Sequence, residues 1–178
     1  MTISVRNTTL LAILIALHMI LSRFFSFHIP FDGVEGIRIG FGTLPLILSG
    51  ILLGPRLGFV AGTIGDLCGF FLVPTGIFLP TFTIAAGLHG FLAGIIAGNG
   101  KMAKEYSRWR TCLAVAVSQV LIALILVPGL LWWHFGIPFW VTLPARIITQ
   151  AILIPSYWAL AYAVLNKVKF FYSEQSLG

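Results

Sequence analysis

The chain consists of six apolar runs joined by short connections, and this pattern constrains the fold more than any other feature. A helix needs about 20 apolar residues to cross a membrane. Six such helices would use about 120 residues and leave room for short connections only. The chain is 58% hydrophobic and 9% charged, whereas a soluble domain carries about 25% charged residues. We therefore predict one all-α membrane domain over residues 1–178 and exclude a soluble fold.

Segments that contain Gly and Pro separate the predicted helices. The expected ranges are residues 8–27, 37–53, 57–72, 81–97, 111–133 and 139–165. The first run lacks the small-residue cleavage site of a secretory signal, so we treat it as the first helix. A polar loop is expected from Pro30 to Gly36, and the hydrophilic segment from Asn99 to Arg110 separates the fourth helix from the fifth.

Basic residues gather on alternate connections, which predicts the orientation of the helices. The two terminal segments and the connections on the same side carry Arg6, Arg56, Lys101, Lys104, Arg108, Arg110, Lys167 and Lys169. The loop between the first two helices lies on the other side and holds Asp32 and Glu35. Cytoplasmic loops of membrane proteins are enriched in Lys and Arg, so we expect both termini in the cytoplasm. This distribution explains the net charge of +6 without nucleic-acid binding.

Four further charged residues fall inside the predicted helices or close to their ends. Arg23 and Arg38 lie near the outer ends of the first two helices, and Arg146 lies about two turns into the sixth. Asp66 is near the middle of the third helix. Charges inside a membrane are costly and usually face a cavity or a partner. These residues are therefore the first candidates for a ligand site.

Motifs of known catalytic chemistry are absent from the sequence. The chain has no P-loop, no H-E-x-x-H and no G-x-S-x-G segment. Cys68 and Cys112 lie in apolar runs without the spacing of metal ligands. We therefore predict a membrane protein that binds a small molecule and has no catalytic residues, metal or cofactor. A membrane-embedded enzyme and a channel-like protein remain alternatives.

The charged and aromatic residues indicate the chemistry of the ligand. Arginines towards the outer face suit a carboxylate, and one buried acid suits a group with paired N–H donors. Several aromatic residues on the outer side could stack on a flat ring. They are Phe24, Phe27, Phe78, Phe82, Trp132, Trp133 and Trp140.

Each candidate also has a purely structural interpretation. Tryptophans are typical of the membrane interface, and Arg23 and Arg38 could extend to lipid headgroups. Asp66 and Arg146 could form a structural ion pair, and His89 could be a helix-packing residue. Glycines at spacings of three and four residues in the third and fourth helices predict close helix packing.

Segments spread over most of the chain resemble the folate-specific S components, which are the substrate-binding subunits of energy-coupling factor (ECF) vitamin transporters. The segments are residues 12–16 (AILIA), 21–24 (LSRF), 38–45 (RIGFGTLP), 49–55 (SGILLGP), 65–67 (GDL), 74–76 (PTG), 78–83 (FLPTFT) and 143–150 (LPARIITQ). The family often has Gly where this chain has Thr81.

The resemblance implies six helices, cytoplasmic termini, a ligand site open to the outside and a place in the bacterial cytoplasmic membrane. It also implies partners, namely a transmembrane coupling subunit and two cytoplasmic ATPases that supply the energy. Such S components are thought to topple in the membrane to release the vitamin inward. Ala12 and Ala16 resemble the small-residue motif that meets the coupling subunit.

For this family the expected ligand is folate, and another vitamin or pterin-like compound is the alternative. The buried acid, the aromatic residues and the outer arginines match the pterin head, the aromatic linker and the glutamate tail of folate. Arg146 and Gln150 could hold the acceptor side of the ring or orient Asp66. The expected substrate-binding residues are Arg23, Arg38, Asp66, Thr75, Phe78, Phe82, His89, Arg146 and Gln150.

Overall fold

The computed structural model describes residues 5–24, 26–31, 34–74, 77–98 and 107–175, with the backbone alone for 26–31, 34–39 and 169–175. The helices are α1 (Val5–Arg23), α2 (Thr43–Leu53), α3 (Pro55–Leu72), α4 (Pro80–Ala97), α5 (Arg108–Gln119), η1 (Val120–Leu126), α6 (Val127–Phe135) and α7 (Phe139–Gln175). Because α5, η1 and α6 follow one another without a break, the described residues form six helical segments. This confirms the predicted number of helices.

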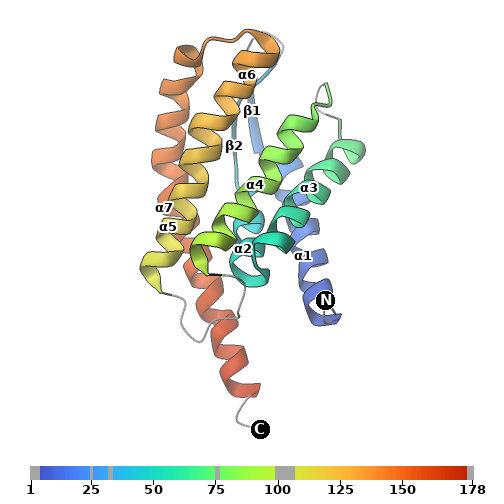
Figure 1. Cartoon of the computed structure of the whole chain (residues 1–178), viewed down its shortest axis with the longest axis vertical. Helices are drawn as coiled ribbons and strands as arrows, with labels where there is room; N and C mark the ends of the chain where they lie inside the picture. Colours follow the sequence, from blue (N-terminus) through green and yellow to red (C-terminus); the bar gives the residue numbers. More distant parts are fainter. Residues whose placement is uncertain (1–4, 25, 32–33, 75–76, 99–106, 176–178) are drawn as a thin grey trace.

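Length and hydropathy mark the protein as one that crosses a membrane several times. Four helical segments are long and apolar enough to span a bilayer, namely Val5–Arg23, Pro80–Ala97, Arg108–Phe135 and Phe139–Val168. In Figure 1, α1 begins and α7 ends at the same end of the bundle, and strands β1 (Ser26–Phe31) and β2 (Val34–Gly40) lie towards the other end.

The connection between α1 and α2 is a β-hairpin, so the predicted boundaries of the first two helices are wrong. Helix α1 ends at Arg23 instead of Phe27, and α2 begins at Thr43 instead of Ile37. Strands β1 and β2 pair antiparallel, with Phe27 opposite Ile39 and His28 opposite Arg38. Two short runs with aromatic and β-branched residues flank an Asp-Gly pair in the sequence, which favours a hairpin over a helix.

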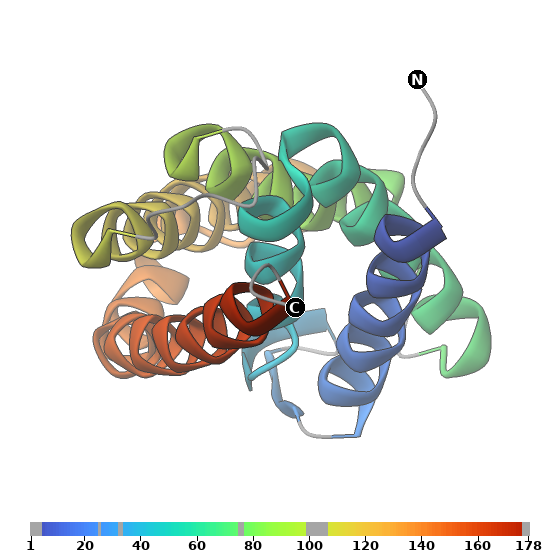
Figure 2. The same ribbon diagram turned by 90° about the horizontal axis from the view of Figure 1, so that it is seen from below.

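Helix α2 forms the centre of the bundle. It packs against α1, α3, α4, α5 and α7, and Figure 2 shows it enclosed by the longer helices. All nine residues from Leu44 to Leu52 are buried, and Ile47 and Ile51 belong to the hydrophobic core. A helix that is apolar on every face is expected at such a buried position.

Glycines allow α2, α3 and α4 to approach closely. A Cβ atom added to Gly58 would lie 2.7 Å from the Gly90 carbonyl oxygen and 2.7 Å from the Gly50 Cα atom. A Cβ atom added to Gly94 would lie 2.6 Å from the backbone nitrogen of Pro55. The glycines of α3 and α4 thus serve helix packing, as small residues commonly do in membranes.

The remaining boundaries differ from the prediction by a few residues, except at the C-terminal end. Helix α7 continues to Gln175 and includes both Pro144 and Pro155. The kink expected at Pro128-Gly129 takes the form of a π-helix, η1, which ends two residues before Pro128. Helix α5 begins at Arg108, three residues earlier than expected.

Candidate ligand-binding site

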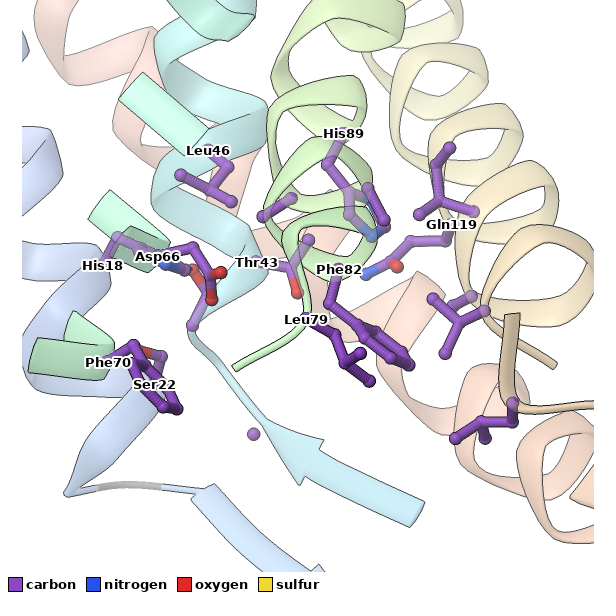
Figure 3. Close-up of a pocket in the computed structure, with 18 of the residues that line it drawn as sticks. His18, Ser22, Thr43, Leu46, Asp66, Phe70, Leu79, Phe82, His89 and Gln119 are labelled. Atoms are coloured by element: carbon purple, nitrogen blue, oxygen red, sulfur yellow. The ribbon is translucent and has the colours of Figure 1, made fainter. Parts of the chain in front are cut away.

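A cavity of about 300 Å³ lies between α1 and α3 on one side and α5, η1, α6 and α7 on the other, and α4 contributes to both walls. Its origin is the short central helix. With 11 residues, α2 is about 16 Å long, roughly half the thickness of the hydrocarbon core. The longer helices continue beyond the N-terminal end of α2 and enclose the space above it. Thr43 and Leu46 of α2 line that space, as Figure 3 shows.

One wall of the cavity carries a polar cluster on α1, α3 and α4. An Arg23 Nη2 atom lies 3.9 Å from Asp66 Oδ1, and Thr83 Oγ1 donates a hydrogen bond of 2.8 Å to Asp66 Oδ2. The Arg23 side chain is 5% exposed and the Asp66 side chain 19%. A carboxylate oxygen has two lone pairs, so Asp66 retains acceptor capacity on its cavity side.

The opposite wall carries polar side chains of α4, α5 and α7. His89 and Gln150 are each 8% exposed, and Gln119 is buried more deeply. Within the described part of the chain, His89 Nδ1 and Gln150 Oε1 have no hydrogen-bond partner. Buried polar atoms normally have partners, so these two atoms are suited to bind a polar ligand or water. In Figure 3, His89 and Gln119 lie across the cavity from Asp66, His18 and Ser22.

Arg146 also faces the cavity from α7, and its guanidinium is held by the backbone of the neighbouring helical segment. The Nη1 group donates to the Ala123 carbonyl oxygen over 3.2 Å. Asp66, in contrast, contacts Arg23 and Thr83. The structure therefore favours Arg23 over Arg146 as the counter-ion of Asp66, which differs from the ion pair considered from the sequence.

Aromatic rings line the cavity towards the hairpin end of the bundle. Phe70, Phe78 and Phe82 all border it. The ring centroids of Phe70 and Phe78 are 5.1 Å apart, and the Phe71 ring stacks against Phe78 at 6.4 Å. This arrangement provides apolar faces for a flat ring.

The predicted tryptophans and Phe24 have a different position. Trp132, Trp133, Trp140 and Phe24 are exposed, and none of them borders the cavity. Exposure on the outside of the bundle agrees with their interpretation as membrane-interface residues.

Two cavity residues fasten the junction between β2 and α2. His18 Nδ1 lies 2.7 Å from the Gly42 carbonyl oxygen, so this nitrogen carries the proton and donates. Tyr157 OH donates to the Gly40 carbonyl oxygen. Sequence reasoning missed His18, Ser22, Gln119 and Tyr157, although polar residues inside apolar runs are a recognised signal of a functional site.

The structure thus brings most of the predicted substrate-binding residues to one cavity. These are Arg23, Asp66, Phe78, Phe82, His89, Arg146 and Gln150. Thr75 and the side chain of Arg38 lie outside the described residues. Ala12 and Ala16 are exposed on α1 and do not border the cavity.

Comparison with known proteins decides the family. The family model described as "ECF-type riboflavin transporter, S component" matches residues 2–166. The chain belongs to this family of ECF transporter S components. Members of the family are components of transporters and not enzymes.

Two solved or curated relatives carry folate in their names. The folate transporter FolT of Clostridium novyi (strain NT) is 29% identical to this S component over 160 residues, which cover 89% of this chain and 87% of the relative. A crystal structure of FolT bound with folic acid superimposes with a TM-score of 0.77 and 28% identity, over 91% of this chain and 95% of that chain.

A more distant structure shows the fold alone. The S component of a bacterial ECF transporter superimposes with a TM-score of 0.51 and 18% identity, over 97% of this chain and 95% of that chain. The S-component fold is therefore common to relatives with little sequence in common.

Proposed function

We propose that this S component captures folate from outside the cell for uptake by an ECF transporter. The observation that carries the proposal is the likeness to FolT bound with folic acid, which extends over 91% of this chain at 28% identity. The cavity supports it, because one space holds an acid, aromatic rings and a second cluster of polar groups. Its volume of about 300 Å³ is at the lower end of the usual range for small-molecule sites.

The pterin head of folate is proposed to bind at Asp66. Its amino group and adjacent ring N–H form a pair of donors that matches the two oxygens of a carboxylate. Arg23 and Thr83 already contact that carboxylate from the other side. Arg23 would therefore act on the ligand through Asp66, which it helps to orient, while Phe78 and Phe82 supply apolar faces for the ring.

The acceptor atoms of the pterin ring are proposed to bind at the wall opposite Asp66, and the glutamate tail is proposed to bind near Arg38. Arg146 and Gln150 face the same cavity and lie four residues apart, on one face of α7. They would hold the acceptor side of the ring together with His89. Arg38 and Thr75 keep their predicted place in the site, with Arg38 directed to the glutamate tail.

Energy for uptake is proposed to come from separate subunits. Because the sequence has no P-loop, a coupling subunit and two cytoplasmic ATPases would drive transport, and the isolated chain should not hydrolyse ATP. Ala12 and Ala16 are exposed and lie four residues apart on α1, so they share a face that allows close helix approach. That face would meet the coupling subunit. The charge pattern favours cytoplasmic termini in a bacterial cell membrane.

Riboflavin is the second candidate, because the family model bears its name. The two ligands can be compared directly by titration calorimetry and thermal shift on the detergent-purified chain. Folate at 100 times its dissociation constant should stabilise the fold by about 2.7 kcal/mol, and riboflavin at the same concentration should give no shift. Binding of riboflavin without binding of folate would overturn the folate assignment and leave the S-component family intact.

A further inference from the structure

The π-helix η1 ends where the chain reaches Pro128, and this position removes a hydrogen-bond donor. In a π-helix each carbonyl accepts from the N–H five residues ahead. The N–H of Val127 follows this pattern and donates to the Ile122 carbonyl. The next carbonyl is that of Ala123, and its partner five residues ahead is Pro128, which has no N–H.

The Ala123 carbonyl is therefore left without a donor from its own helix. The alternative donor of an α-helix, four residues ahead, is Val127, whose N–H points to Ile122. Ala123 is half-buried, and a carbonyl shielded from water needs a partner from elsewhere, since an unsatisfied acceptor is costly. The guanidinium of Arg146 supplies that partner from α7 over 3.2 Å.

This contact fixes the direction of a long side chain at the wall of the cavity. Ala123 and Arg146 both border the cavity. Pro128 is fully buried and does not border the cavity. An arginine loses considerable rotamer freedom when a ligand immobilises it. An anchor that is present before the ligand arrives lowers that cost.

We propose that Pro128 is a positioning residue for ligand binding. It ends the π-helix so that the Ala123 carbonyl accepts from Arg146, and it thereby fixes the direction of the Arg146 guanidinium at the wall of the cavity. The identity of the ligand rests on the proposed function, whereas the link between Pro128 and Arg146 does not.

The link itself is tested without ligand, by thermal unfolding of four proteins in detergent. These are the wild type, Pro128→Ala, Arg146→Met and the double variant. Arg146→Met removes the donor and should lower the melting temperature of the wild type. Pro128→Ala restores an N–H that can reach the Ala123 carbonyl, so Arg146→Met should cost clearly less in that background. Equal losses in both backgrounds would overturn the proposed link.

The effect on the ligand is tested by folate titration of the same four proteins. Pro128→Ala should weaken binding about two- to tenfold, the range for one long side chain that must be immobilised anew. In the Arg146→Met background, Pro128→Ala should cause no further loss of folate affinity. Gly129→Ala is the matched control, because a Cβ at Gly129 has no atom within 4 Å among the described residues and adds no donor.

The remaining outcomes are also decisive. Unchanged affinity in Pro128→Ala, or an equal loss in the presence and absence of Arg146, would contradict a positioning role. If Pro128→Ala does not fold, Pro128→Val supplies the same N–H in a side chain of similar size. If the wild type binds riboflavin and not folate, the proposed function fails, while the unfolding cycle still tests the link and riboflavin replaces folate in the titration.

Discussion

Arg23 of α1 and Asp66 of α3 meet at the wall of the cavity, with 3.9 Å between Nη2 and Oδ1. The separation is longer than a direct hydrogen bond, so the contact is mainly electrostatic. It places a positive charge beside the half-buried acid and ties the last turn of α1 to the ligand site. The face of α1 that carries Ala12 and Ala16 thus belongs to the same rigid helix as a residue of the cavity.

Asp66→Asn should weaken folate binding and leave the fold largely intact. The amide keeps the shape of the side chain but loses the charge and one acceptor, so the pterin donors lose a partner. The affinity should fall by about 1–3 kcal/mol, the usual cost of an unsatisfied buried group. Titration calorimetry measures this loss, and thermal unfolding without ligand shows whether the protein is folded. Unchanged affinity would remove Asp66 from the site.

Arg23 and Arg38 should affect different parts of the ligand. Arg23→Gln removes the counter-ion of Asp66, so it should weaken folate and pteroic acid, which lacks the glutamate tail, by similar factors. Arg38→Gln should weaken folate by about 1.5–3 kcal/mol and leave pteroic acid nearly unchanged. Both ligands are titrated against each variant. A selective loss of folate in Arg23→Gln would instead place Arg23 at the tail.

Ala12→Trp or Ala16→Trp should block assembly with the coupling subunit and preserve ligand binding. A bulky side chain on this exposed face prevents close helix approach, but the face does not border the cavity. Co-purification of the complex and folate titration of the isolated chain report the two properties separately. Leu17→Trp is the control, because Leu17 is also exposed on α1 but lies five residues from Ala12 and one from Ala16, so it does not share their face. Loss of folate binding in the Ala variants would indicate packing inside the chain.

Gly58→Ala should destabilise the bundle. The added Cβ would lie 2.7 Å from the Gly90 carbonyl oxygen and from the Gly50 Cα atom, and both belong to backbone that cannot rotate away. Overpacking of this kind costs about 1–3 kcal/mol. Thermal unfolding in detergent, compared with Gly129→Ala as a substitution into open space, measures the difference. Equal melting temperatures would mean that α3 can shift without penalty.

The sequence predicts the six helical segments and the charged residues of the cavity for one physical reason. Charged and polar residues are rare within a membrane, so Arg23, Asp66 and Arg146 are conspicuous, and the structure gathers them around one space. The ion-pair partner of Asp66 could not be chosen in the same way. Spacing along the chain places a residue on a face of its helix but does not say which other helix lies opposite.

Hydropathy patterns alone could not predict the hairpin or the π-helix. Short apolar runs of strand length, such as Ser26–Phe31, cannot be distinguished from helix by hydrophobicity alone. Pro128 indicates a break, but whether the freed carbonyls meet water, a hydroxyl or an arginine depends on α7, which lies far away in the sequence. Glycine spacing predicted the close packing of α3 and α4 correctly, because two helices can approach closely only where side chains are small, whichever helix is the neighbour.

The length of α2 determines how deep in the bundle the ligand site lies. A ligand that rests on Thr43 and Leu46 would have the 11-residue helix α2 beneath it, and a helix of about 16 Å is roughly half as long as a hydrocarbon core is thick. Helix α2 itself closes the space below the ligand, because every residue from Leu44 to Leu52 is buried against neighbouring helices. Rotation of a few side chains would not open a passage there, so we expect release on that side to need a movement of whole helices or of the whole protein.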